Sequence, residues 1–367
     1  MYPSDIRPLT SLRICAALWV LVYHFRNHLD LGLDRFGLAF KGYLGVDLFF
    51  ILSGFILSHV YTRAWAERRF HYGSFLWARL ARVYPVHLVT LGATIAIWLV
   101  ALRLGVAFEP QAFDPRMLPQ HLLLVHAWGT TPTVQWNFPS WSISAEWFAY
   151  LCFPVAAMLS MALRQRPRLM VLGALLLFAV MFLIAQARGV LFTDMSAQIG
   201  ALRIIPAFLM GAALHRLGSS VTVPSRAAVL GALAATAWVA TAASLRLNDL
   251  YIWPALALLI FCLAETSKTS GGGVMAAPIL VYLGEVSYGV YMVHLPVDIV
   301  YFHGLGRIAP NLSGAPAALA WGGAFVACLL AAMMVYHGVE RPARNWLRAH
   351  DPFARRPIPE PPREPVL

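Results

Sequence analysis

Charged residues are scarce in this chain. Only 12% of its 367 residues are Asp, Glu, Lys or Arg, whereas 59% are hydrophobic. A water-soluble domain with this balance would expose large apolar patches, which soluble monomers avoid. The scarcity of charge therefore excludes an ordinary soluble domain and indicates a protein of the lipid bilayer.

Cysteine is sparse as well, and several familiar motifs are missing. The four cysteines fall in apolar stretches at spacings that fit neither a metal site nor a disulfide framework, so we expect small core residues at Cys15, Cys152, Cys262 and Cys328. The chain has no Walker phosphate loop, no dinucleotide-binding glycine pattern, no internal repeat and no nucleic-acid recognition module. These absences argue against a nucleotide-binding α/β fold, a repeat protein and a nucleic-acid partner.

What the chain does have is a series of apolar runs, each close to the roughly 20 residues that cross a hydrocarbon core about 30 Å thick. They predict an all-α, polytopic transmembrane bundle with about ten spanning helices. The first run is not a cleaved signal peptide, because Arg13 interrupts it and no small-residue cleavage site follows. We expect the bundle to fill residues 1–348, followed by a proline-rich cytoplasmic tail at 349–367 that is disordered. The predicted spans are 8–28, 44–62, 78–103, 142–162, 168–187, 197–216, 227–245, 250–266, 276–298 and 317–338.

Lysine and arginine are distributed unequally between the two sides of this bundle. Of the 28 such residues, 18 fall on the side of the N-terminus, 8 on the opposite side, and two, Arg13 and Arg203, within spans. Because retained cytoplasmic loops carry the excess of positive charge, we predict that both termini are cytoplasmic. The same bias explains most of the net charge of +11, which therefore gives no indication of a nucleic-acid partner.

Arg13 and His24 stand together in the first span, in the segment LTSLRICAALWVLVYHF. Eleven positions at 100° per residue bring the two side chains to within about 20° of one helix face, about 16 Å apart along the axis. An ionisable residue inside a span costs about 2.5–3.5 kcal/mol, so each one suggests a function. The alternative is that Arg13 extends toward the cytoplasm while His24 lies in the membrane interface.

Four further spans carry ionisable residues at a similar depth, near their outer ends. They are Asp47, Glu146, Arg203 and His294. A histidine beside carboxylates suits general acid/base catalysis, because a carboxylate orients the imidazole and stabilises its charged form. Each residue alone is explained as well by an interfacial cap or by a structural ion pair such as Asp47 with Arg203. Together they favour a catalytic site.

Arg79 and Arg82, in the segment RLARVYP, are three residues apart and point to the same side of a helix. Two guanidinium groups on one face suit the recognition of phosphate. Arginines at a cytoplasmic helix end are also expected from topology, and the sequence alone favours that explanation. His24 and His28 have a spacing that a metal can use, but no third ligand accompanies them, so we expect no metal.

Other polar residues have simpler explanations. Ser53, Ser142 and Ser144 lack a surrounding GxSxG motif, so we expect hydrogen bonding rather than nucleophilic catalysis. Glu340 and Arg341 are most simply a helix cap and a cytoplasmic charge at the end of the last span. A rival explanation of the whole set is a transporter or proton-coupled carrier, because the same side chains can relay protons. The absence of repeats and of broken helices argues against it.

Six of these segments together resemble the acyltransferase family 3 membrane proteins, an O-acetyltransferase-like group that acylates sugars and other extracytoplasmic acceptors. The resemblance spans most of the predicted domain. It rests, in order along the chain, on RPLTSLRICAALWVLVYHF, GVDLFFILSGFI, RLARVYP, WSISAEWFAY, VSYGVYMVHLP and VERPARNW.

The resemblance implies an O-acyltransferase of the bacterial inner membrane. An acyl group, usually acetyl, would move from cytoplasmic acyl-CoA to a hydroxyl of a saccharide or similar acceptor at the outer face. His24 is implied as the catalytic base, with Arg13 as its paired motif residue on the path of the acyl arm. Arg79 and Arg82 match the arginine pair of the family and are expected to bind CoA.

Around the base, the resemblance leaves several points open. Asp47 or Glu146 is expected to orient and charge-balance the imidazolium. The acceptor is expected near Arg203, His294 and Ser142. Direct transfer and a covalent acyl-enzyme are both possible, as are a longer acyl chain and a small-molecule acceptor such as a macrolide, and the oligomeric state is unknown. Many relatives append a secreted hydrolase-like domain, whereas a short tail follows here, so we expect no second catalytic step in this chain.

Overall fold

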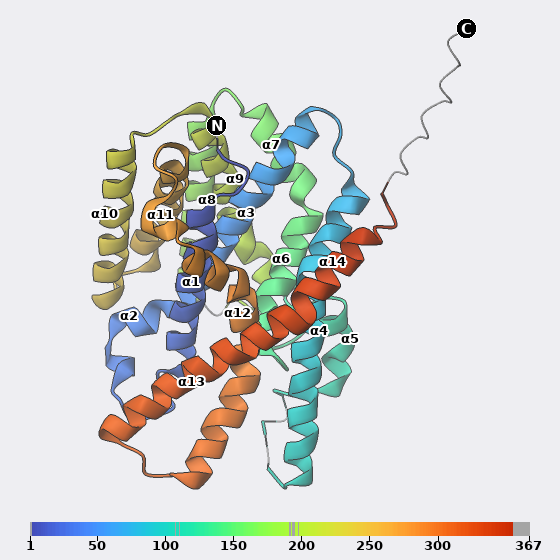
Figure 1. The fold of residues 1–367 in the computed structure, drawn as a ribbon, viewed down its shortest axis with the longest axis vertical. Helices are drawn as coiled ribbons and strands as arrows, with labels where there is room; N and C mark the ends of the chain where they lie inside the picture. Colours follow the sequence, from blue (N-terminus) through green and yellow to red (C-terminus); the bar gives the residue numbers. More distant parts are fainter. Residues whose placement is uncertain are drawn as a thin grey trace.

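The computed structural model describes residues 2–354, apart from residues 107, 110, 191, 193, 194 and 197. Within these residues it is a bundle of helices without a β-strand (Figure 1), which confirms the predicted all-α, polytopic class. The helices are α1 (Arg7–Phe25), α2 (Gly37–Phe40), α3 (Leu44–Ala66), α4 (Tyr72–Arg103), α5 (Leu118–Leu122), α6 (Trp141–Leu151), α7 (Phe153–Ala162), α8 (Pro167–Ala187), α9 (Gly200–Ser220), α10 (Ser225–Ser244), α11 (Asp249–Thr269), α12 (Pro278–Ile308), α13 (Gly314–Val335) and α14 (Arg341–Ala349).

Fewer helices than predicted are apolar enough to cross a membrane by their own composition. Among the described residues, seven helical segments are long and apolar enough, and the bent pair α6–α7 adds an eighth. The two remaining predicted spans correspond to α9 and α12. Both bury polar residues inside the bundle, among them Arg203 and His215 in α9 and Ser287 and His294 in α12. By length and composition, the described residues therefore give seven or eight candidate spans and not about ten, because α9 and α12 carry polar residues that they bury inside the bundle.

The fourth predicted span is not one continuous helix. The chain bends by 54° between α6 and α7. Pro154, in the first turn of α7, has no N–H for the carbonyl of Tyr150 and its ring crowds that carbonyl. The α6 half, which carries Ser142 and Glu146, therefore takes its own direction. The expectation that no helix is broken was therefore wrong, and it is no longer an argument against a transporter or proton-coupled carrier.

Two close helix pairs, α3 with α9 and α1 with α12, form the centre of the bundle. A Cβ on Gly54 of α3 would lie 2.0 Å from the carbonyl oxygen of Phe208 in α9. A Cβ on Gly284 of α12 would lie 2.0 Å from the carbonyl oxygen of Thr10 in α1. Small residues permit such close backbone approach in membrane helices. This packing fixes how the polar side chains of the four helices meet.

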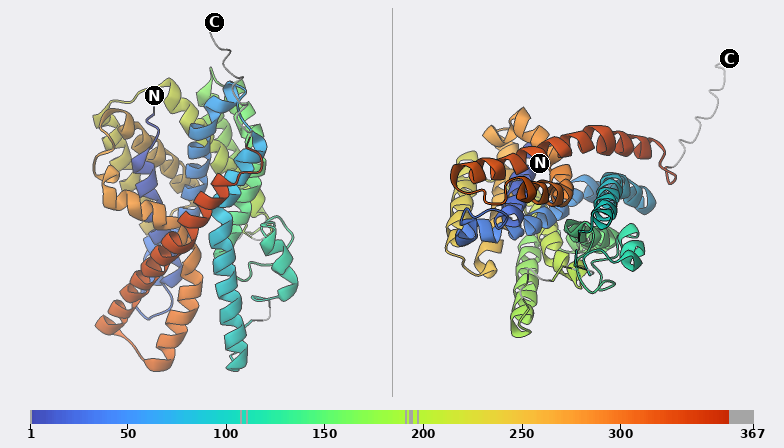
Figure 2. Two further views of the ribbon diagram at one scale, coloured as in Figure 1. Left: turned by 45° about the vertical axis from the view of Figure 1, so that its right-hand side comes forward. Right: turned by 90° about the horizontal axis from the view of Figure 1, so that it is seen from below.

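Both ends of the described chain lie on one side of the bundle (Figures 1 and 2). We call it the terminal side, and the side with the turn between α12 and α13 the distal side. Helix α13 crosses the bundle diagonally toward the terminal side, and α14 packs against α4, where the Trp77 indole donates to the carbonyl of Leu347. At the start of the expected tail, Phe353 contacts Gly73. Residues 355–367 lie outside the described residues.

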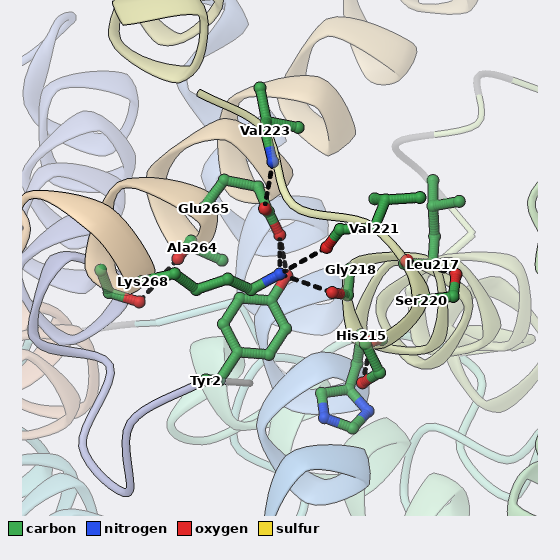
Figure 3. A network of polar contacts seen from close by, with 12 residues as sticks. Tyr2, His215, Leu217, Gly218, Ser220, Val221, Val223, Ala264, Glu265 and Lys268 are labelled. Atoms are coloured by element: carbon green, nitrogen blue, oxygen red, sulfur yellow. Dashed lines mark hydrogen bonds and ion pairs between the residues drawn. The ribbon is translucent and has the colours of Figure 1, made fainter. Parts of the chain in front are cut away.

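A buried network on the terminal side ties the beginning of the chain to α9 and α11 (Figure 3). The Tyr2 hydroxyl donates to Oε1 of Glu265 at 2.6 Å, and Nζ of Lys268 lies 2.6 Å from the same oxygen. Lys268 also donates to the carbonyls of Gly218 and Val221, at the end of α9. These contacts satisfy carbonyls that a helix end leaves without intrahelical partners.

Three buried histidines hold the loop between α4 and α6 against α4. His87 Nε2 lies 2.9 Å from the carbonyl oxygen of His121, and the rings of His121 and His126 stack with centroids 4.0 Å apart. Ser140 Oγ lies 3.1 Å from Nε2 of His126. Burial in the loop lowers the pKa of His121 to about 3 and the pKa of His126 well below its ordinary value.

The cysteines are all free, but they are not all in the core. Cys262 and Cys328 are buried, whereas Cys15 and Cys152 are exposed on the surface of the bundle. The expectation of small core residues therefore holds for two of them. Along membrane spans the outer surface faces lipid, so an apolar thiol is tolerated there without burial in protein.

Candidate active site

Five predicted site residues line one cavity, which we call the arginine cavity. It lies among α1, α3, α4, α6 and α12, and its open space, including the mouth, is about 880 Å³. The side chains on which the site depends are Arg13, Arg79, Arg82, Ser142, Glu146 and Tyr291.

A second space, the histidine cavity, contains the other end of the predicted site. His24 and Arg203 line it, together with Tyr43, Phe138 and Tyr291. Arg13 and His24 thus open into different cavities, although they lie on one helix and close to one face. Helix α1 runs away from the terminal side, so Arg13 lies nearer that side than His24 does.

The two cavities adjoin each other. Val46 of α3 and Tyr291 of α12 line both. The Tyr291 hydroxyl donates to the carbonyl of Pro139 at 2.9 Å and accepts a hydrogen bond from Ser142 at 2.8 Å. Tyr291 is therefore held in place in the common wall, and the predicted acceptor residue Ser142 is one of the groups that hold it.

The arginine cavity is positive and is partly balanced by one buried carboxylate. Arg82 forms an ion pair with Glu340, and Arg344 of α14 lies 3.6 Å from the same carboxylate. Arg79 lies over the ring of Tyr61, with 5.7 Å between its guanidinium carbon and the ring centroid. Glu340 is fully buried, so the expectation of a simple helix cap is wrong. The chain turns Glu340 inward because the segment from Tyr336 to Glu340 is a π-helical bulge, a feature frequent at functional sites.

Glu146 belongs to the arginine cavity and not to the surroundings of His24. Its Oε1 accepts a hydrogen bond from Ser53 at 2.6 Å, and Arg13 lies within electrostatic reach. In the described part of the chain, Glu146 makes no hydrogen bond to His24. Its assignment as the partner of the catalytic base stays a prediction without a contact to support it.

One of the described ring partners of His24 is a second histidine. The rings of His24 and His294 stack, with centroids 4.9 Å apart and an angle of 26° between planes. His294 is buried, and its Nδ1 lies 2.5 Å from the carbonyl oxygen of Tyr291, which makes Nδ1 the N–H donor. Phe138 packs against His24 on another side, at 4.9 Å between ring centroids. The base is therefore fixed mainly by rings.

Asp47 forms an ion pair with Arg203, with 2.7 Å between Oδ2 and Nη2. Both side chains are buried, and the guanidinium lies over the ring of Trp141. Among the described contacts, Asp47 makes no hydrogen bond to His24. The structure thus has the ion pair that the sequence offered as the alternative to a catalytic carboxylate.

The sequence analysis did not predict two features near the site: the pairing of His28 with Asp298, and the position of Arg344. His28 and Asp298 form an ion pair, with 2.6 Å between Nε2 and Oδ1, beside the stacked histidines. The signal was available, because Asp298 follows His294 by four residues just as His28 follows His24. Arg344 was not recognised either, since the fold of α14 onto α4 leaves no trace in the sequence. Within the described residues, no three His, Cys, Asp or Glu side chains are arranged to hold a metal ion.

A bundle of apolar helices with two adjoining cavities, one lined by arginines and the other by His24, defines a polytopic membrane protein with ionisable groups in its interior. The chain belongs to the family described as the acyltransferase domain, whose family model matches residues 8–337. The match begins in α1 and ends in the π-helical segment after α13, so every predicted site residue falls within it. The resemblance stated from the motifs is thereby confirmed.

Three relatives are similar to parts of the chain. Acyltransferase MdmB of Streptomyces mycarofaciens is 34% identical over 165 residues, 42% of this chain. Protein 2 in picA locus of Rhizobium radiobacter is 37% identical over 103 residues, 28% of this chain. The putative peptidoglycan O-acetyltransferase YrhL of Bacillus subtilis (strain 168) is 25% identical over 379 residues, 92% of this chain. The matches cover 40%, 51% and 54% of these relatives, so the chain spans about half their length. No solved structure gives a significant match.

Proposed function

We propose that this chain transfers an acyl group, acetyl in the simplest case, from acyl-CoA to a hydroxyl of a saccharide or similar acceptor. The observation that carries the proposal is the pair of adjoining cavities, one lined by arginines and the other by His24, with Val46 and Tyr291 common to both. A donor in one cavity and an acceptor in the other would meet at this common wall.

The arginine cavity is the proposed donor site. Arg79 and Arg82 of α4, with Arg344 of α14, offer guanidinium groups that can grip phosphate oxygens in pairs. Nε of Arg79 is buried and has no described hydrogen-bond partner, so a ligand oxygen would satisfy it. The acyl arm of CoA would then extend past Arg13 toward Tyr291.

The histidine cavity is the proposed acceptor site, with His24 as general base. A ring nitrogen of His24 takes the proton of the acceptor hydroxyl while the oxygen attacks the thioester carbonyl. The new ester bond forms, the carbon–sulfur bond breaks, and His24 returns the proton to the sulfur of CoA. Arg203 and His294 would contact the acceptor or shape its cavity.

The direction of transfer follows from the charge distribution. Since 18 of the 28 Lys and Arg residues belong to the side of the N-terminus, the terminal side is proposed to face the cytoplasm, where CoA is available. The acceptor would then lie at the outer face of a bacterial inner membrane. The name of the YrhL relative, a putative peptidoglycan O-acetyltransferase, supports a saccharide of the cell envelope as the acceptor.

A proton-coupled carrier is the second candidate, and the 54° bend between α6 and α7 favours it, because broken helices form the sites of many transporters. Purified protein in nanodiscs, given acetyl-CoA labelled in the acetyl group and a glycan acceptor, separates the two. We expect labelled ester and free CoA, and both should vanish in His24→Ala. The control is His350→Ala, on an exposed ring at the end of α14, which should turn over normally. Absence of label transfer in the wild type would contradict the acyltransferase, and full turnover in His24→Ala would remove its role as base.

A further inference from the structure

Two pairs of polar side chains face each other between the distal half of α12 and the end of α1. The first pair is the stack of His24 on His294, with 4.9 Å between ring centroids. The second is the ion pair of His28 with Asp298, with 2.6 Å between Nε2 and Oδ1. Asp298 is one turn beyond His294 on the same helix, about 6 Å along its axis. The His28–Asp298 pair therefore adjoins the stack of His24 on His294.

The His28–Asp298 pair is held in place by ring stacking and is partly buried. The ring of His28 lies flat on the ring of Phe302, with centroids 4.2 Å apart and an angle of 10°. The Asp298 side chain is 16% exposed and the His28 side chain 31%. An ion pair in free solution would be screened and its geometry lost, but this one is fixed by stacking.

The histidine stack itself has no carboxylate in contact with it among the described residues. Asp47 is bonded to Arg203, and Glu146 accepts a hydrogen bond from Ser53 in the arginine cavity. A base that gains a proton gains positive charge, and a nearby negative charge is needed to favour that form. Asp298 is the carboxylate within electrostatic reach of His294.

We propose that Asp298 is a positioning residue of the acyl transfer: its carboxylate, held by His28, balances the positive charge that forms on the stacked rings of His24 and His294. The inference rests on the proposed function. Positive charge appears when His24 takes the proton of the acceptor hydroxyl, and it disappears when that proton passes to the sulfur of CoA. Asp298 keeps its charge throughout and exchanges no proton.

The other charged and titratable groups around the stack do not supply this negative charge. On the side of α1, Arg26 and His28 lie within electrostatic reach of His24, and neither carries a negative charge. Tyr43 reaches the histidine cavity from the segment before α3, and Arg203 reaches it from α9. Cys328 of α13 lies within electrostatic reach of Asp298 and is buried.

The experiment is the pH dependence of kcat/KM for acetyl transfer, from pH 5 to 8, in Asp298→Asn. The mutant keeps the size of the side chain and a hydrogen-bond partner for His28, but it removes the charge. Because a negative charge raises the pKa of a nearby imidazole, we expect the acidic limb to move to lower pH by about one unit. On the plateau, kcat/KM should fall roughly three- to tenfold, because a weaker base removes the proton less well. Asp298→Glu restores the negative charge, so its acidic limb should return to the pH of the wild type.

Two controls separate this role from a structural one. Glu67→Gln removes an exposed carboxylate that pairs with Arg63 and Arg69 between α3 and α4, and its profile should match the wild type. His28→Gln leaves the charge of Asp298 in place, so its acidic limb should stay or move to higher pH. The inference would be overturned if the acidic limb of Asp298→Asn coincided with that of the wild type. It would also be overturned if the acidic limb of His28→Gln moved to lower pH as well.

The proposed function is tested in the same series. If the wild type turns over and His24→Ala does not, a normal limb in Asp298→Asn contradicts only the role of Asp298. If His24→Ala keeps full activity, the base assignment fails and the role of Asp298 fails with it. The two results are therefore distinguishable in one set of proteins.

Discussion

Asp47 and Arg203 form a fully buried ion pair that joins α3 to α9, with 2.7 Å between Oδ2 and Nη2. The side chains are 1% and 2% exposed, so the pair is inside the protein and not in the membrane interface. Arg203 also lines the histidine cavity, while Asp47 makes no described hydrogen bond to His24. We therefore expect the pair to contribute mainly to the stability of the protein and to the shape of the histidine cavity.

Asp47→Asn should reveal this structural role. Removing one charge of a buried pair costs about 3–5 kcal/mol, because the other charge stays in a poorly solvating interior. We expect a clear fall in the melting temperature of the purified protein in detergent, measured by intrinsic fluorescence. The transfer rate per folded molecule should fall less than in His24→Ala. An unchanged melting temperature with abolished transfer would instead return Asp47 to the catalytic group.

Gly54→Ala tests the close contact of α3 with α9. The added Cβ would lie 2.0 Å from the carbonyl oxygen of Phe208, so the helices must separate. Overpacking of this kind costs about 1–3 kcal/mol. The matched control is Gly92→Ala in α4, where a Cβ meets nothing within 4 Å and the better helix propensity of alanine should leave stability equal or slightly higher. Equal melting temperatures for the two variants would contradict the packing described.

Arg79 and Arg82 should give different results although they are neighbours. Arg79→Gln leaves every described ion pair intact, so we expect about a tenfold rise in KM for acetyl-CoA with an unchanged melting temperature. Arg82→Gln removes the partner of buried Glu340, so both KM and stability should suffer. Isothermal titration with CoA and thermal melting measure the two effects. Equal CoA affinity in wild type and Arg79→Gln would make that arginine a topology signal only.

The loop between α4 and α6 should loosen in acid. Burial lowers the pKa of His121 to about 3, whereas an unfolded histidine titrates near 6.5. Between these values the unfolded chain binds a proton that the folded chain does not, so stability is lost as pH falls below about 6.5. The loss is about 2 kcal/mol per histidine at pH 5. His121→Phe keeps a flat ring and cannot titrate. Its melting temperature should therefore depend less on pH between 7 and 5, and an equally steep decline would contradict the explanation.

What a single helix determines could be predicted from the sequence, and what two helices determine together could not. The spacing of Arg13 and His24 is a property of α1, and both do face cavities of the site. The partners of Glu340 and His24 depend instead on how helices rotate against one another, which is set by contacts such as that of Gly284 with Thr10. The pair of Asp47 with Arg203 could be named from the sequence, but only as one of two alternatives. Counting apolar runs likewise gave more spans than there are sufficiently apolar helices among the described residues, since α9 and α12 bury polar residues inside the bundle.

The beginning of the chain acquires its partners late. Tyr2 is bonded to Glu265, 263 residues away, and the two are further joined by the cation of Lys268 over the ring of Tyr2. During synthesis the first residues must wait until α11 has been made and inserted before this contact can form. The network of Figure 3 therefore closes only after most of the chain has been made, and it then holds the N-terminal segment against α9 and α11.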